Sequence, residues 1–219
     1  DSDVPEDAYL SKELVRYFPK ALQEGYIADM ENHRLRREII ATAVTNSMVN
    51  RMGATFLQRM QEDTGETPAQ ISKGYTVSRE VLDARGLWAA IDELDLKVPE
   101  SAQIAALTAL WHLLRNMTRW LLNRPGDIVV IAAMVDRYLG PLHELRRALP
   151  SILPAPDRAA LQNERNRWKS QGFGDELALA MASVPYLSYG LDIVEVAIER
   201  NLPVADVGLV YFALSDALH

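Results

Sequence analysis

The stretch from His33 to Met60 constrains the fold more than any other, because it predicts one long helix. It contains no proline, and its only glycine is Gly53, so little interrupts about seven turns of helix. Asn32 stands where an N-cap is expected. The apolar side chains form two stripes on roughly opposite sides, the first of Leu35, Ile39, Val49, Phe56, Leu57 and Met60, the second of Ile40, Val44, Met48 and Met52. A helix that is apolar on two sides is predicted to lie at the centre of a bundle or at an interface.

Three polar residues, Thr42, Asn46 and Asn50, fall within the first stripe together with Gly53. A buried asparagine amide costs free energy unless it is hydrogen-bonded, so each would need a partner on a neighbouring element. The pattern favours a polar network that fixes the register of packed helices. A ligand pocket lined by Asn46 and Asn50 is the alternative. Gly53 is predicted to let another backbone approach closely.

Arg34, Arg36 and Arg37 crowd the start of this helix, where the helix dipole favours acids. Three nearby acids offset part of that cost: Asp29, Glu31 and Glu38. We expect at least one of the arginines to pair with a carboxylate on another element or partner, and solvated arginines are the alternative.

Composition excludes several classes of function. The formal net charge of −7 argues against a nucleic-acid surface. The chain has no cysteine, which excludes disulfides and thiolate metal sites and suits a reducing cytoplasm. The charge-free run from Ser101 to Leu114 is too short to span a bilayer. Both ends of the 219 residues are interpreted as cuts in a longer protein.

The remaining patterns predict an all-α chain, an irregular bundle of about ten helices around residues 33–60. The other helices are expected at 11–18, 20–29, 68–84, 87–94, 99–122, 128–139 (divided or kinked at Gly140-Pro141 before resuming to 148), 157–171, 175–184, 188–200 and from 203. The segment from Ile128 to Ile131 could instead be a buried strand. Three prolines between Leu149 and Pro156 predict a boundary. It separates a helical core, residues 1–150, from a smaller subdomain, residues 151–219, cut at its C-terminal end.

Motifs that carry catalytic or cofactor chemistry are missing from the sequence. Its one G-x-G, Gly172-Phe173-Gly174, has Leu177 in place of the third glycine of a dinucleotide-binding loop and is interpreted as a helix junction. Arg147 stands where a zinc helix beginning at His143 would need a second histidine. His112, on a mostly apolar helix, is predicted to be a core residue. We therefore assign no catalytic, cofactor-binding or metal-binding residue.

The long helix also carries a family resemblance. The run His33-Arg34-Leu35-Arg36-Arg37-Glu38-Ile39-Ile40-Ala41-Thr42, with Asn46, Val49-Asn50-Arg51, Gly53 and Phe56, resembles a signature of the large bacterial NAD-dependent glutamate dehydrogenases. Flanking matches are Tyr17-Phe18-Pro19, Thr64-Gly65, Leu87-Trp88, Ile91 to Asp95 and Arg119-Trp120-Leu121. The matched region lies C-terminal to the catalytic domain of that family. The resemblance covers roughly the first 120 residues well and the rest loosely.

The resemblance implies a cytoplasmic parent enzyme that converts L-glutamate, NAD and water to 2-oxoglutarate, ammonia and NADH. This region would serve packing, assembly or regulation, bind no cofactor itself, and contact the catalytic domain of the same chain in a homo-oligomer, without nucleic acid or membrane. The structural or domain-contact residues would be Arg34, Arg36, Arg37, Asn46, Asn50, Arg51 and Gly53. The alternative is a free-standing helical module that binds a ligand or protein through Asn46, Asn50 and the tryptophans.

Overall fold

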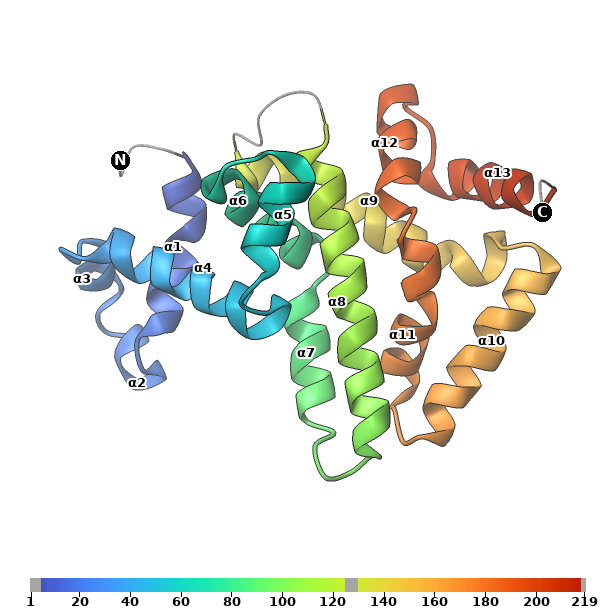
Figure 1. The fold of residues 1–219 in the computed structure, drawn as a ribbon, viewed down its shortest axis with the longest axis horizontal. Helices are drawn as coiled ribbons and strands as arrows, with labels where there is room; N and C mark the ends of the chain where they lie inside the picture. Colours follow the sequence, from blue (N-terminus) through green and yellow to red (C-terminus); the bar gives the residue numbers. More distant parts are fainter. Residues whose placement is uncertain (1–4, 125–129, 218–219) are drawn as a thin grey trace. The chain divides into compact units, whose positions relative to one another are not determined.

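The computed structural model describes residues 5–124 and 130–217 and contains, within them, thirteen helices and no strand (Figure 1). The prediction of an all-α chain is confirmed. The helices are α1 (Pro5–Tyr17), α2 (Lys20–Gln23), α3 (Ile27–Glu31), α4 (Arg36–Met52), α5 (Phe56–Thr64), α6 (Pro68–Val81), α7 (Ala84–Asp92), α8 (Glu100–Leu122), α9 (Ile131–Ile152), α10 (Ala155–Ser170), α11 (Asp175–Leu187), α12 (Gly190–Arg200) and α13 (Val204–Ala217).

The chain divides into two compact units. Unit 1 comprises residues 1–77 and 121–134, and unit 2 comprises residues 78–120 and 135–219. This division differs from the predicted boundary near residue 150. The helix α9 continues through Pro150 to Ile152, because a proline near the end of a helix removes few backbone hydrogen bonds.

Unit 1 buries the second apolar stripe of α4. Val44, Met48 and Met52 are buried there, and α1 contacts α2, α3 and α4. Ser47 shares a hydrogen bond of 2.9 Å with the hydroxyl of Tyr75, which is fully buried in α6. At the N-terminus of α6, the backbone N–H of Gln70 donates to Thr67 Oγ1 at 3.3 Å, which is the hydrogen bond that a threonine N-cap accepts.

The predicted helix over residues 33–60 is wrong, because the chain breaks at Gly53. Gly53 has a φ of +91° and ends α4, with its N–H donating to the carbonyl of Val49 at 3.0 Å. Only glycine adopts such a backbone readily. A Cβ built at Gly53 would meet nothing within 4 Å, so the predicted close approach of a second backbone is also wrong. Asn32 is the C-cap of α3, whereas Leu35 precedes α4, so the predicted N-cap is wrong as well.

Two further predictions concern α9. The helix continues through Gly140 and Pro141 without division, because one proline removes a single ladder hydrogen bond and neighbouring packing can hold the helix together. The start of the helix predicted at residue 128 lies outside the described residues. From Ile131 onward the segment is helical rather than a strand.

Unit 2 contains a buried polar cluster that joins α8, α9 and α12. Glu195, with 8% of its surface exposed, accepts hydrogen bonds from the hydroxyl of Tyr138 at 2.8 Å and from Arg137 Nη2 at 2.9 Å. The hydrogen bond to Glu195 raises the pKa of Arg137. Trp120 Nε1 donates to Asp192 at 2.7 Å, and its ring meets that of Tyr138 edge-on with centroids 5.9 Å apart. These contacts fix the register of three helices.

The junction between α10 and α11 has the predicted position. Gly172, Phe173 and Gly174 connect the two helices, which contact each other, and Phe173 is buried against Trp168 with ring centroids 4.8 Å apart. In the described part of the chain no single helix has the length and apolar character needed to cross a membrane. One pair, α11 with α12, passes that test jointly but is bent by 73°.

Candidate functional site

The polar residues of α4 that were predicted to form a buried network lie in solvent. Thr42, Asn46 and Asn50 are exposed, so the expected buried polar network is wrong. The reason is that α4 turns its second stripe inward, which leaves the first stripe outside. Leu35 and Val49 on that side are 50% and 41% exposed. We call Leu35, Thr42, Asn46, Val49 and Asn50 the α4 outer face.

The predicted contact arginines lie at the two ends of α4. Arg34 and Arg37 are exposed and Arg36 is half-buried. The backbone N–H of Leu35 donates to His33 Nδ1 at 3.1 Å, so the imidazole orders the turn that precedes the helix. Glu38 is the acid in the first turn, and Arg51 lies in the last turn, where the helix dipole favours a cation. The α4 outer face therefore combines apolar and amide groups, whereas Arg37 lies on the other side of the helix, beside Ile40 and Val44.

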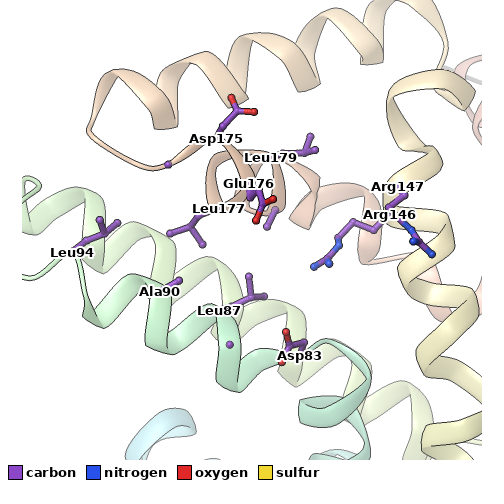
Figure 2. Close-up of a pocket in the computed structure, with 13 residues that line it drawn as sticks. Asp83, Leu87, Ala90, Leu94, Arg146, Arg147, Asp175, Glu176, Leu177 and Leu179 are labelled. Atoms are coloured by element: carbon purple, nitrogen blue, oxygen red, sulfur yellow. The ribbon is translucent and has the colours of Figure 1, made fainter.

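Unit 2 contains a pocket of about 790 Å³ formed by α7, α9 and α11, which we call the α7–α11 pocket (Figure 2). Its volume lies in the range of about 300–1,000 Å³ that is usual for ligand sites. The lining residues are Asp83, Gly86, Leu87, Ala90, Leu94, Arg146, Arg147, Gly174, Asp175, Glu176, Leu177, Leu179 and Ala180.

The α7–α11 pocket has an apolar end and a charged end. Leu94 and Leu177 lie at the apolar end, whereas the side chain of Arg146 extends from α9 toward the space between Asp83 and Glu176 (Figure 2). Arg146 forms no ion pair with any residue that the structure describes. The pocket can therefore accept an aliphatic group at one end and a polar group at the other. Its lining offers no histidine, serine or cysteine for nucleophilic chemistry.

The charged end depends on the absence of a side chain at Gly86. A Cβ at this position would lie 2.7 Å from Oδ2 and 3.0 Å from Oδ1 of Asp83. Asp83 itself has a positive φ of 53° and precedes α7. Glycine thus leaves room for the Asp83 carboxylate beside the first turn of α7.

A salt-bridge pair fixes the start of α11 at the edge of the same pocket. Lys169 Nζ lies 2.8 Å from Asp175 Oδ1, and Arg165 pairs with the other oxygen of that carboxylate. Lys169, followed by Arg165, lowers the pKa of Asp175. Because the side chain of Asp175 is 53% exposed, these salt bridges contribute little to the stability of the fold.

His143 lies one turn before Arg146 on α9 and is half-buried. Its Nε2 has no hydrogen-bond partner in the described residues. Burial, followed by the charge of Arg146, lowers the pKa of the imidazole. His143 is therefore neutral near pH 7. His112, predicted to be in the core, is exposed and lies against the ring of Trp111 with centroids 4.8 Å apart.

Only indirect signals of the α7–α11 pocket are present in the sequence. Leu87, Ala90 and Leu94 have the spacing of one helix face, but that pattern predicts burial as readily as a pocket wall. Leu177 and Arg147 stood out only as departures from other motifs. No group of three or more histidine and acidic side chains that could hold a metal ion occurs within residues 5–124 and 130–217.

Comparison with known proteins identifies the family to which the chain belongs. The family model described as glutamate dehydrogenase, C-terminal, matches residues 1–219. The chain is 32% identical over 215 residues to the NAD-specific glutamate dehydrogenase of Pseudomonas aeruginosa, covering 98% of this chain and 13% of that protein. It is 32% identical over 196 residues to the Halomonas elongata protein of the same name, covering 90% and 12%. For the Mycobacterium tuberculosis protein of the same name, identity is 29% over 217 residues, covering 99% and 13%. The chain therefore belongs to the family of glutamate dehydrogenase C-terminal regions.

Proposed function

We propose that these residues form the helical packing and assembly region of an NAD-dependent glutamate dehydrogenase. The observation that carries this proposal is the family match over the whole of residues 1–219. The chain spans only 12–13% of the curated relatives named above. The reaction therefore belongs to the parent enzyme, which would convert L-glutamate, NAD and water to 2-oxoglutarate, ammonia and NADH in the cytoplasm. The match favours this proposal over a free-standing binding module.

NAD belongs to the parent enzyme rather than to these residues. The sequence lacks the glycine-rich loop that brings a pyrophosphate against a helix N-terminus. We expect the 219-residue chain to oxidise no glutamate and to bind no NAD at micromolar concentration in isothermal titration calorimetry. Stoichiometric micromolar binding would contradict the assignment.

The α4 outer face is the proposed contact with the catalytic domain of the same chain or with another subunit of a homo-oligomer. Leu35 and Val49 supply exposed apolar surface, and Asn46 and Asn50 supply amides that can donate and accept hydrogen bonds. Arg34 and Arg36 flank Leu35 in the sequence and place positive charge at the N-terminal end of this surface, in a chain of net charge −7. The partner surface should therefore carry carboxylates, which arginine binds with two parallel hydrogen bonds.

The test introduces charge on this face in the full-length enzyme. Val49→Asp should reduce the population of the native oligomer, measured by light scattering, because it places a carboxylate in an apolar contact. Asn163→Asp on α10 is a control at an exposed position in unit 2. A Val49→Asp enzyme with wild-type oligomer size, glutamate oxidation rate and thermal stability would contradict the proposed contact.

A further inference from the structure

One side of α13 carries large apolar side chains that lie in solvent. Leu209, Val210 and Leu214 have 48%, 56% and 60% of their surface exposed. Ala213 and Ala217 are also exposed, and steps of three and four residues put all five on one side of the helix. We call these five residues the α13 outer face.

The opposite side of α13 is firmly held in unit 2. Val204, Gly208 and Phe212 are buried, and the ring of Phe212 meets that of Tyr186 edge-on with centroids 6.0 Å apart. The approach at Gly208 is so close that a Cβ would lie 2.9 Å from Leu145 Cδ1. The α13 helix is thus an anchored element, and a contiguous apolar surface of this kind marks an interaction site.

The charges on α13 indicate what chemistry the partner has. Asp206 and Asp216 are exposed toward the two ends of the helix, and α13 contains no basic residue. A second copy is a poor partner, because antiparallel pairing would place Asp206 against Asp216 and parallel pairing would place each acid against itself. Like charges in contact across an interface are destabilising. The complementary surface is apolar and flanked by lysine or arginine.

We propose that the α13 outer face docks an amphipathic helix of the parent polypeptide that lies outside these 219 residues. This inference rests on the proposed function, since it takes the chain to be part of a longer enzyme. The chain spans 13% of the Pseudomonas aeruginosa and Mycobacterium tuberculosis relatives, so a parent of that size supplies many candidate segments. The docked helix presents aliphatic side chains at i, i+3 or i+4, and i+7. Its basic residues face Asp206 and Asp216.

Site-specific photo-cross-linking in the full-length enzyme tests the docking. p-Benzoylphenylalanine at Ala213, irradiated and mapped by peptide mass spectrometry, should cross-link to a helical segment of the same polypeptide that contains lysine or arginine beside an apolar stripe. The same probe at Asn163, exposed on α10, should leave that segment unlabelled. A cross-link to α13 of a second copy, a cross-link to lipid, or no cross-link at all would overturn the proposal.

Substitutions on the α13 outer face give a second readout. Leu214→Asp and Asp206→Lys should each speed deuterium uptake in the docked segment about tenfold or more, because one removes buried apolar area and the other reverses the charge. Asn163→Lys is the matched control, and unchanged uptake in both α13 variants would overturn the docking.

The failure of this inference can be distinguished from the failure of the proposed function. An effect of Val49→Asp on assembly, combined with no effect of the α13 substitutions, would reject this inference alone. An open reading frame without a catalytic part would reject the proposed function itself.

Discussion

At the scale of single residues, Tyr138 and Glu195 are buried polar groups of unit 2 that pair across two helices. Glu195 holds the hydroxyl of Tyr138, whose side chain is 1% exposed, and the guanidinium of Arg137. Sequence patterns did not identify this cluster, because Arg137 and Glu195 are 58 residues apart. His143 is the opposite case, a half-buried imidazole that retains one nitrogen without a partner.

Removing Glu195 should destabilise unit 2. Glu195→Ala leaves the buried Tyr138 hydroxyl without its acceptor, which should lower the free energy of unfolding by about 1–3 kcal/mol. Urea unfolding monitored by circular dichroism measures the change. Glu199→Ala, at an exposed position on the same helix, should change the free energy by less than about 0.5 kcal/mol. Equal effects of the two substitutions would show that the cluster adds nothing to stability.

Stability should depend on the ionisation of His143. Because its folded pKa is lowered from the ordinary value of 6.5, the unfolded chain binds a proton more readily than the folded chain below pH 6.5. The free energy of unfolding should therefore fall as the pH drops from 6.5 toward the folded pKa, and should be fully retained above 6.5. His143→Gln should make this decline shallower in urea titrations at several pH values. A decline identical to that of the wild type would contradict this role.

At the scale of elements, the break between α4 and α5 determines which apolar side chains are buried. Before Gly53 the second stripe faces inward, with Val44 and Met48 buried. After Gly53, Phe56 and Met60 of the first stripe are buried instead. A straight helix would hold the two sets on opposite sides, so the change of direction at Gly53 lets both contribute to the core.

Substitution of Gly53 tests this account. Gly53→Ala forces a side chain into a backbone conformation with a φ of +91°, which should lower the free energy of unfolding by about 1–3 kcal/mol. Gly25→Ala is the control, since Gly25 is exposed and a Cβ there meets nothing within 4 Å. If Gly53→Ala instead raises both helicity and the unfolding midpoint, the continuous helix predicted from the sequence is the correct description.

At the scale of the whole molecule, the α4 and α13 outer faces are the surfaces through which these residues would meet the rest of a parent enzyme. Arg37, exposed in the first turn of α4, should pair with a carboxylate on another part of the parent enzyme. Exposed pairs contribute at most about 1 kcal/mol, so a clear effect requires a partly desolvated pair.

Charge reversal at Arg37 should separate assembly from folding. In the full-length enzyme, Arg37→Glu should lower glutamate oxidation or shift the oligomer to smaller species in light scattering. Its thermal unfolding as the 219-residue chain should change little. Arg59→Glu, exposed on α5 in the same unit, serves as the control. Unchanged activity and oligomer size after reversal of Arg34, Arg36 and Arg37 in turn would identify them as solvated surface charges.

The sequence by itself determined the all-α class and most helix positions, because these depend on local periodicity and on helix-breaking residues. It also determined the family, because a run of specific residues from Arg34 to Phe56 carries the resemblance. The tertiary structure decided which stripe of α4 is buried, since two apolar stripes on one helix are equivalent until neighbouring helices pack against one of them. It likewise decided that Gly53 ends a helix, because glycine tolerates both helical and positive φ and only packing selects between them. The α7–α11 pocket and the Glu195 cluster also depend on packing, since they join residues far apart in the chain.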